Sequence, residues 1–372
     1  MARSHVYIVG AGFSKHAGLP LQSEFTKALL EPRANECHPM RPLADYLGKF
    51  VHDAFDHKKD ANAKFWPSLE DVFTNIDLAA NTGHHLGHEH APSDLRKTRR
   101  VLLARMIRML DERFAKAESA KDADWRRLDR FFQKLNTKDS GFISINWDTV
   151  IERKVAGLAE THSIDYRCGA LPAVFPSKGN VVAGHQPPDG KATIPIVKIH
   201  GSVNWLYCDN CRQLYWFPMK DGLSISMQLI TGNEADSLNL HDVSGCAKWR
   251  CSNCTDVPLT TRIATFSYLK ALDFPMFERS WLSAERLLRQ AKKWIFIGYS
   301  LPAADYEFKH LLKRIQLSMS PPPEFVVITG GPKSATESVY RNYHGFFGRG
   351  IRKQENFFRN GLTAKAIAAA QE

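Results

Sequence analysis

Short apolar runs separated by longer amphipathic stretches are the dominant pattern of this chain. Runs of this length, flanked by turn residues, are typical of strands buried on both faces of a parallel sheet. Five of them stand out, at residues 6–9, 141–145, 194–199, 294–297 and 325–328. Because helix-compatible segments lie between them, the pattern predicts an α/β protein with a Rossmann-like parallel sheet.

The first run leads into a glycine-rich turn, Gly10-Ala11-Gly12-Phe13-Ser14. Glycines in such a turn let backbone N–H groups approach a pyrophosphate, and the N-terminus of a following helix favours the same negative charge. We predict this helix at about residues 18–30. The turn favours nucleotide binding, although a glycine-rich turn is also a common way to leave a strand.

Residues 43–135 show helical periodicity without strand-like runs, which predicts a helical insertion over one end of the sheet. A loop rich in glycine and proline and two cysteine pairs follow later in the chain. We therefore expect three kinds of unit: a Rossmann-like nucleotide-binding domain in three parts, the helical insertion, and a small zinc-ribbon-like module. Their predicted bounds are 1–42, 136–206 and 265–372 with a C-terminal tail for the first, 43–135 for the second, and 207–264 for the third.

Composition fits a soluble protein larger than one average domain, since the 372 residues are 44% apolar and 24% charged. No apolar run approaches the ~18 residues that a membrane span needs. The sequence begins with a core strand instead of a signal peptide. From these features we expect a cytoplasmic protein.

The formal net charge of +11 raises the question of an anionic partner. The densest basic run, residues 96–100 with Arg105 and Arg108, falls on a predicted helix whose other side is apolar. This arrangement favours the solvated face of an amphipathic helix over a nucleic-acid groove. Direct nucleic-acid binding therefore has only weak support.

Two Cys-x-x-Cys pairs predict a metal site. Such pairs, with turn residues inside them, are typical of a tetrahedral structural Zn²⁺ that holds a module together and performs no chemistry. Cys246 is an alternative ligand, and four unligated thiols are the competing interpretation. The histidine-rich segment at residues 84–90 is interpreted as a surface loop because nothing fixes its geometry. The predicted ligands are Cys208, Cys211, Cys251 and Cys254.

Polar side chains close the later apolar runs. Asn146 and Asp148 follow the second run, and His200 follows the third. Because the carboxyl ends of parallel strands open onto the ligand crevice, these are candidate site residues. Helix capping is the competing role for Asp148, and a structural role is the competing one for His200. The fourth run leads into a Gly-x-Ser turn suited to phosphate or ribose contact, with Gly298, Ser300 and, just beyond, Asp305.

Taken together, these motifs resemble the ordered motif series of the sirtuin superfamily over most of the chain outside residues 50–135. The series consists of Gly10-Ala11-Gly12-Phe13-Ser14 with Gly18-Leu19-Pro20, Asn146-Trp147-Asp148, His200-Gly201, the paired Cys-x-x-Cys, and Gly298-Tyr299-Ser300-Leu301. The forms Ser-Ile-Asn-Trp-Asp, Ile-His-Gly-Ser-Val-Asn-Trp and Ile-Gly-Tyr-Ser-Leu-Pro are most similar to bacterial sirtuin-like proteins that act as NAD-cleaving effectors in antiphage defence.

This resemblance implies a sirtuin-type fold with NAD as substrate and a structural Zn²⁺. It implies that Asn146 orients a water or the nicotinamide ribose, that Asp148 holds the carboxamide, and that His200 is a general base near the ribose hydroxyls. The turn at residues 10–14 would bind the pyrophosphate, and Gly298 and Ser300 would contact the adenosine side. The full set of implied NAD-binding residues is Gly10, Ala11, Gly12, Phe13, Ser14, Asp148, Gly298, Ser300 and Asp305.

Two departures from the family pattern bear on the reaction. Protein deacylases carry a Val-x-Phe-Gly-Glu type strand after the second cysteine pair, whereas residues 257–262 read Val-Pro-Leu-Thr-Thr-Arg. The adenosine-binding Asn of sirtuins is replaced by Thr329-Gly330. The first departure argues against deacylation, and the second leaves the adenine contacts unassigned.

We therefore predict an NAD⁺ hydrolase that releases nicotinamide and ADP-ribose and depletes NAD in bacterial antiphage defence. The alternatives are an NAD-dependent deacylase or ADP-ribosyltransferase and, from another class, an NAD or ADP-ribose sensor without turnover. An enzyme that destroys a shared cofactor must be restrained. By resemblance we expect a homo-oligomer, an activating partner such as an ATPase or a nucleic-acid-guided protein, or both.

Overall fold

The first apolar run forms β1 (His5–Val9), an inner strand of a seven-stranded sheet. The strand order is β11-β10-β9-β1-β2-β6-β3, and every neighbouring pair is parallel. The predicted α/β class with a Rossmann-like parallel sheet is therefore confirmed. The other strands of this sheet are β2 (Ser140–Ser144), β3 (Ser163–Asp165), β6 (Thr193–Lys198), β9 (Lys293–Ile297), β10 (Glu324–Ile328) and β11 (Phe357–Phe358).

These statements rest on a computed structural model. The residues that it describes are 3–30, 40–56, 66–158, 163–174, 182–183, 193–218, 222–240, 246, 248–261, 263 and 274–372.

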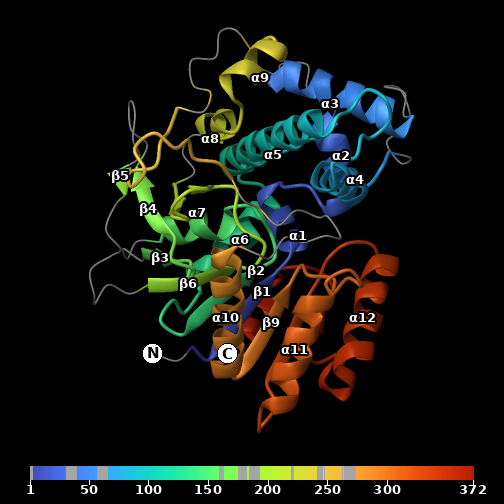
Figure 1. Ribbon diagram of the computed structural model, residues 1–372. Helices are drawn as coiled ribbons and strands as arrows, with labels where there is room; N and C mark the ends of the chain where they lie inside the picture. Colours follow the sequence, from blue (N-terminus) through green and yellow to red (C-terminus); the bar gives the residue numbers. More distant parts are fainter. Residues whose placement is uncertain are drawn as a thin grey trace.

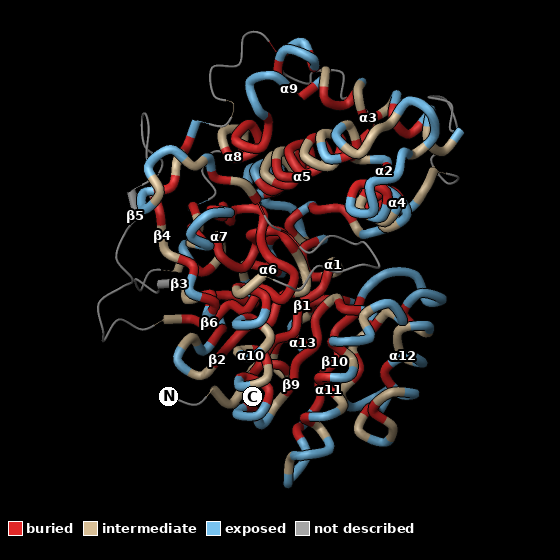
Figure 2. The backbone as a smooth tube through the Cα atoms, viewed as in Figure 1, coloured by how far each residue is buried: buried red, intermediate tan, exposed pale blue. Residues whose placement is uncertain are grey.

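Helices cover both faces of the sheet because successive strand side chains point to opposite sides. Val6 and Ile8 of β1 pack in one apolar cluster with helices α10 (Pro275–Gln290), α11 (Tyr306–Ser318) and α12 (Lys333–Phe347). Tyr7 and Val9 pack in the other cluster, with α6 (Ala123–Gln133) and α13 (Ala364–Gln371). Figure 2 shows the resulting buried band of strands between exposed helix surfaces.

The Ala-rich C-terminal segment is helix α13 and is part of this core. Tyr7 Oη donates to the carbonyl oxygen of Ala370 at 3.1 Å, and Gln371 Nε2 donates to that of Phe131 at 2.9 Å. α13 therefore contacts both the central strand and α6. In the described part of the chain, no helix combines the length and apolar character needed to cross a membrane.

The chain leaves β1 differently from the prediction of one helix over residues 18–30. A four-residue helix, α1 (Ala11–Ser14), follows the strand directly, and a 3₁₀ turn, η1 (Lys15–Ala17), ends at Gly18 with a φ of 74°. α2 (Gln22–Leu30) then begins four residues later than predicted. The left-handed Gly18 and Pro20 account for the break, since neither continues a helix.

A group of helices lies above the carboxyl end of β1 in Figure 1. They are α2, α3 (Met40–Phe55), α4 (Leu69–Thr82) and α5 (Pro92–Ala120). The predicted helix at the basic run is α5, but its predicted solvated face is wrong at one position. Arg105 is only 3% exposed, because residues 101–107 are buried all round the helix. Its Nη1 donates to the carbonyl oxygen of Met40 at 3.0 Å, and its Nε donates to that of Leu29.

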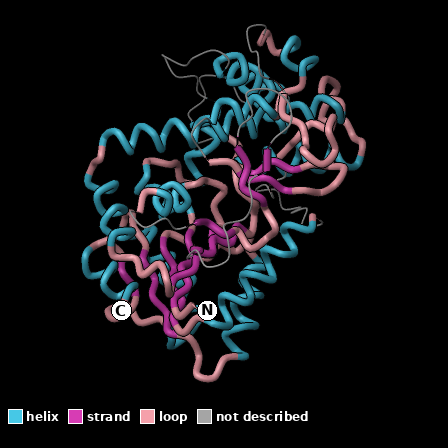
Figure 3. The backbone as a smooth tube through the Cα atoms, turned by 90° about the vertical axis from the view of Figure 1, so that its left-hand side faces the viewer, coloured by secondary structure: helices cyan, strands magenta, loops and turns pink. Residues whose placement is uncertain are grey.

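A second, four-stranded sheet carries the first cysteine pair. Its order is β5-β4-β8-β7, and Figure 3 shows it as a separate group of strands. The first cysteine pair occupies the turn of the antiparallel β7–β8 hairpin. The remaining elements are β4 (Leu171–Val174), β5 (Val182–Ala183), β7 (Trp205–Tyr207), β8 (Leu214–Trp216), α7 (Val150–Ala156), α8 (Gly222–Gln228), α9 (Gly232–Ser237) and η3 (Gly348–Gly350).

The role of Arg105 leads to a stability prediction. Arg105→Met keeps the apolar stem but leaves the carbonyl groups of Leu29 and Met40 without this donor. We expect a loss of roughly 3 kcal/mol in the free energy of unfolding, measured by urea denaturation. Arg126→Met is the matched control, because Arg126 is exposed and donates to Lys121 at the surface. It should change stability by only about 0.5 kcal/mol. Equal effects of the two changes would contradict a structural role for Arg105.

Candidate active site

The site lies where the strand order reverses. From β1 the chain fills the sheet through β2 and β6 on one side, and later through β9 and β10 on the other. In open α/β sheets, ligands bind at the carboxyl ends of the strands beside such a switch point. The glycine-rich turn follows β1 at this edge, and the Gly298 turn follows β9.

The two turns are in direct backbone contact. Gly12 N donates to the carbonyl oxygen of Gly298 at 2.9 Å, and Gly10 N donates to that of Ile297 at 3.1 Å. A Cβ on Gly298 would lie 2.1 Å from Phe13 N, and one on Gly12 would lie 2.8 Å from Gly298 Cα. Gly298 also has a φ of 63°. The glycines therefore have a packing reason at these positions, independent of any ligand.

Phe13 faces the core instead of the crevice. Its side chain is buried against Phe131 and Phe132, with ring centroids 5.8 and 6.1 Å away. Its N–H donates to the carbonyl oxygen of Gly10 at 2.9 Å. Its side chain therefore anchors α1 to α6 and the sheet.

Three of the predicted site residues form one hydrogen-bonded cluster. Asn146 Nδ2 donates to Ser14 Oγ at 2.8 Å, and Ser14 Oγ donates to Asp148 Oδ2 at 2.6 Å. Ser14 and Asp148 are buried and Asn146 is half-buried. The cluster joins the ends of β1 and β2, which are neighbours in the sheet.

Asp148 also contacts the start of α7, from the position before the N-cap residue Thr149. Its Oδ1 accepts from Val150 N, the first residue of α7, at 3.0 Å. One carboxylate oxygen thus supports the start of a helix while the other accepts from Ser14. Asp148 thus supports the helix start from the position before the N-cap, while its role at a ligand site stays a prediction.

His200 lies two residues after the end of β6 and is buried. Its Nδ1 lies 3.3 Å from the carbonyl oxygen of Ile145, the residue before Asn146. Because a carbonyl oxygen only accepts, this contact requires the proton on Nδ1 and makes Nε2 the basic position of the neutral ring. The contact also brings the ends of β2 and β6 together.

The residues that follow Gly298 are held by hydrogen bonds of two tyrosines. Tyr299 Oη donates to Asp305 Oδ2 at 3.0 Å, and Tyr343 Oη donates to the carbonyl oxygen of Tyr299 at 2.9 Å. Burial, and next to it the charge of Asp305, raise the pKa of Tyr299 well above its usual value. Ser300 is exposed at the surface of this turn. Asp305 therefore has a structural partner, while Ser300 faces solvent.

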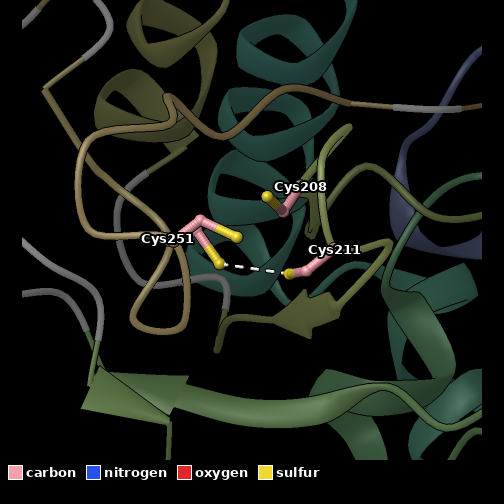
Figure 4. A group of neighbouring side chains, drawn as sticks. Cys208, Cys211 and Cys251 are labelled. Carbon is pink, nitrogen blue, oxygen red and sulfur yellow. Dashed lines mark hydrogen bonds between the residues drawn. The ribbon is translucent and has the colours of Figure 1, made fainter.

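The four predicted zinc ligands converge. The Sγ atoms of Cys208, Cys211, Cys251 and Cys254 all lie within 4.8 Å of one another. Figure 4 shows three of them, with Cys211 Sγ 3.5 Å from Cys251 Sγ. Tetrahedral Zn–S bonds of about 2.3 Å would put sulfurs about 3.8 Å apart, so the cluster fits a zinc ion. Cys246 is outside this group, and no second group of this kind occurs among the described residues.

The backbone of the two cysteine pairs supports the same interpretation. Each pair is followed by a left-handed residue, Arg212 with a φ of 62° and Thr255 with a φ of 45°. Polar groups also reach the sulfurs: Tyr215 Oη lies 3.4 Å from Cys251 Sγ, and Asn210 Nδ2 donates to Cys254 Sγ at 3.3 Å. Burial by itself raises the pKa of Cys251, but hydrogen bonds, first among them that of Tyr215, lower it to about 7.

The histidine-rich segment and the departures from the family pattern also have defined places. Within residues 84–90, Leu86 pairs with His90 in a bridge, and the His90 ring packs on Phe50 at 5.0 Å. Thr260 exchanges backbone hydrogen bonds with Tyr207 of β7, at 2.6 and 2.9 Å. Thr329 follows β10 and exchanges backbone hydrogen bonds with Phe358 and Gly361.

The sequence analysis missed a second group of buried polar side chains, Lys198, Glu152 and Tyr166, which contacts the backbone of Asp148. Lys198 is 0% exposed, donates from Nζ to the carbonyl oxygen of Asp148, and lies 3.3 Å from Glu152 Oε1. Tyr166 Oη donates to the same Glu152 oxygen at 3.1 Å. The available signal was a lysine within an otherwise apolar strand and a glutamate one helical turn after Asp148.

No protein-family model and no curated protein matches this chain. Among solved structures, it is similar to a sirtuin solved to explain substrate affinity, at 14% identity and a TM-score of 0.34 over 99% of this chain and 92% of that one. It is also similar to Sir2Tm bound to a propionylated peptide, at 14% identity, a TM-score of 0.32, and coverages of 99% and 91%. It is similar as well to a Sir2 complex with p53 peptide and NAD⁺, at 14% identity and a TM-score of 0.31 over 100% of this chain and 91% of that one. Such TM-scores describe a loose superposition, so the functional proposal rests on the residues of this chain.

The contact between the two glycine turns predicts a sharp steric limit. Gly298→Ala places a Cβ against Phe13 N at a positive φ, so we expect a loss of at least about 2 kcal/mol in the free energy of unfolding. Gly345→Ala is the control, because nothing lies within 4 Å of a Cβ there and Gly345 is inside α12. It should raise stability by about 0.5 kcal/mol. Thermal melting of both variants checks the pair, and an unchanged Tm for Gly298→Ala would contradict the contact.

The cysteine cluster predicts about one Zn²⁺ per chain in purified protein. Cys208→Ser should abolish stoichiometric zinc and cost several kcal/mol of stability, because the binding free energy of such a site is largely folding free energy. Elemental analysis and thermal melting measure the two effects. Cys246→Ser is the control and should keep its zinc. Purified wild-type protein with far less than one zinc would overturn the assignment.

Proposed function

We propose that this protein cleaves NAD⁺ at the nicotinamide glycosidic bond and releases nicotinamide and ADP-ribose. The observation that carries the proposal is the Ser14–Asn146–Asp148 cluster at the switch-point edge of the sheet. It gathers a hydroxyl, an amide and a carboxylate at the ends of β1 and β2, and His200 contacts Ile145, the residue before Asn146.

Cleavage of this bond needs little covalent catalysis by the protein, because nicotinamide leaves as a neutral molecule from a cationic substrate. The glycosidic C–N electron pair goes to nicotinamide, water adds to the ribose carbon, and the water's proton is lost. A polar pocket that stabilises the oxocarbenium-like centre and positions the water supplies the acceleration. In this proposal Asn146 orients that water, and His200, with Nε2 as its basic position, acts as general base near the ribose hydroxyls.

Asp148 is proposed to hold the carboxamide of nicotinamide. Its two oxygens already accept from Ser14 and Val150, and each carboxylate oxygen has a further lone pair for the amide N–H₂. These two contacts fix the carboxylate before substrate arrives. Preorganisation of this kind lets a polar group act without reorienting during the reaction.

The phosphate and adenosine contacts follow the two glycine turns. The turn at residues 10–14 is proposed to bind the pyrophosphate, through Gly10, Ala11, Gly12 and Ser14; the N–H groups of Gly10 and Gly12 also donate within the chain. Gly298 and the exposed Ser300 are proposed for the adenosine side. Asp305 contributes indirectly, through its bond from Tyr299.

Deacylation and ADP-ribosyl transfer to a protein are the alternatives that use the same bond cleavage. The sequence of residues 257–262, which lacks the Val-x-Phe-Gly-Glu type strand of protein deacylases, disfavours deacylation. A sensor would bind NAD or ADP-ribose without releasing nicotinamide.

We further propose an NAD-depleting effector of bacterial antiphage defence, on the forms of the motifs at residues 144–148, 199–208 and 297–305. An activity that consumes a shared cofactor has to be restrained until needed. We therefore propose a homo-oligomer or an activating partner protein as the control.

The discriminating experiment incubates purified protein with NAD⁺ and measures free nicotinamide and ADP-ribose, with and without an acylated peptide. Equal release of both products without peptide supports hydrolysis. Release that requires the peptide supports deacylation, label transfer to protein supports ADP-ribosylation, and binding without release supports a sensor.

The catalytic assignment predicts a large loss of turnover in folded protein. His200→Ala or Asn146→Ala should lower NAD⁺ turnover by roughly 10²-fold, the value of a general base or a positioning group. His344→Ala and Asn136→Ala, at exposed positions, are the matched controls. Tm and nicotinamide release are measured on the same preparations. A lowered Tm with nearly normal specific activity would mean that His200 and Asn146 have structural roles only.

A further inference from the structure

The ion pair between Lys198 and Glu152 is enclosed in the protein. The two side chains are 0% and 6% exposed, and Nζ lies 3.3 Å from Oε1. Lys198 is the last residue of β6, two positions before His200, and Glu152 lies on α7, four positions after Asp148. The pair therefore connects the two segments that carry proposed site residues.

Lys198 holds the main chain of Asp148 directly. Its ammonium group donates to the carbonyl oxygen of Asp148. The carboxylate of the same residue is fixed by Ser14 Oγ at 2.6 Å and by Val150 N at 3.0 Å. The backbone of Asp148 is thus held by Lys198, and its carboxylate is held by Ser14 and Val150.

Glu152 pairs with Lys198 and also accepts a hydrogen bond from Tyr166. Its Oε1 accepts from Tyr166 Oη at 3.1 Å, and that hydroxyl accepts from Asn204 Nδ2 at 3.1 Å. Burial raises the pKa of Glu152, while the charge of Lys198 opposes the rise and that of Asp148 adds to it. A lysine at this distance from the carboxylate compensates its charge in a region without solvent.

Stability alone gives weak reason for such a pair. Desolvation of two buried charges offsets most of their attraction, and well-packed apolar residues of similar volume usually stabilise a fold as well or better. An apolar residue at position 198 would also continue the pattern of β6, whose other residues from 194 to 197 are buried. An apolar side chain, however, cannot donate to the carbonyl group of Asp148.

We propose that Lys198, oriented by Glu152, is a positioning residue of the NAD-cleaving site that fixes Asp148 where its carboxylate meets the nicotinamide carboxamide. This inference rests on the proposed function and adds two residues to it. Lys198 acts through Asp148 and does not touch the substrate.

A set of four variants tests it. Lys198→Met removes the donor and leaves Glu152 uncompensated. Glu152→Gln keeps Lys198 and its bond to Asp148. The double change Lys198→Met with Glu152→Leu removes both charges together. Lys154→Met is the control, because it breaks an ion pair with Asp129 on the other side of the same helix.

We expect Lys198→Met to lower kcat/KM for nicotinamide release about 10²-fold, the effect of a displaced positioning group. The double variant should regain part of the Tm that Lys198→Met loses and keep that low kcat/KM, whereas Glu152→Gln should lose only about tenfold. ADP-ribose, which lacks nicotinamide, should bind every variant within about twofold of wild type, because the phosphate contacts are unaltered. Lys154→Met should keep normal kcat/KM.

A folded double variant with near-normal kcat/KM would overturn the inference and leave the pair a structural feature. If Lys198→Met fails to fold, the double variant and Glu152→Gln carry the test. If wild-type protein binds NAD⁺ but releases no nicotinamide, the proposed function fails and the positioning role is judged by calorimetry. The folded double variant should then lose about tenfold in NAD⁺ affinity and none in ADP-ribose affinity. Unchanged NAD⁺ affinity would overturn it.

Discussion

The close approach of Gly12 and Gly298 is the constraint on which the site depends. The turns after β1 and β9 meet at the point where the sheet reverses its order, and there is no room for a Cβ between them. This contact fixes the direction in which the chain leaves β1. Ser14, four residues after Gly10, is thereby brought to the end of β2, where Asn146 and Asp148 lie.

From this contact inward, each polar group is held by another. Ser14 donates to Asp148, and Asp148 accepts from the start of α7. Glu152 of α7 pairs with Lys198, which donates to the carbonyl oxygen of the same Asp148. A carboxylate in a buried site is costly unless its hydrogen-bonding positions are used, so the surrounding donors are what make it tolerable. The same donors orient it, as the proposed contact with the nicotinamide carboxamide requires.

The sequence predicted the strands and the cysteine cluster well because both depend on local signals. Short apolar runs define strands irrespective of their partners, and Cys208 and Cys211 are separated by a spacing that one hairpin turn can satisfy. It failed where burial depends on distant segments. Helical periodicity alone predicts a solvated position for Arg105. It cannot reveal burial by Leu29 and Met40, whose carbonyl oxygens accept from Arg105 and which are far from it in the sequence.

The site was predictable in part for the same reason. Asn146, Asp148 and His200 could be placed at strand ends from the pattern, but which strand ends are neighbours depends on sheet order, which the pattern does not contain. Lys198 and Glu152 were missed because a charged residue within a buried strand is identified only when its partner is known. The helix after β1 was misplaced because Gly18 and Pro20 were included in it instead of ending it.

The helical part is tied to this edge of the sheet through one carboxylate. Asp111 of α5 pairs with Arg153 of α7 and accepts from the N–H of Gly222 at the start of α8, at 3.1 Å. A Cβ on Gly222 would lie 2.6 Å from Asp111, so the two helices meet at van der Waals limits. A small cavity bounded by Asp111 and Asp148 lies at this junction. Because α7 carries Arg153 toward α5 and Glu152 toward Lys198, the position of this short helix links α5 to Lys198 and, through it, to Asp148.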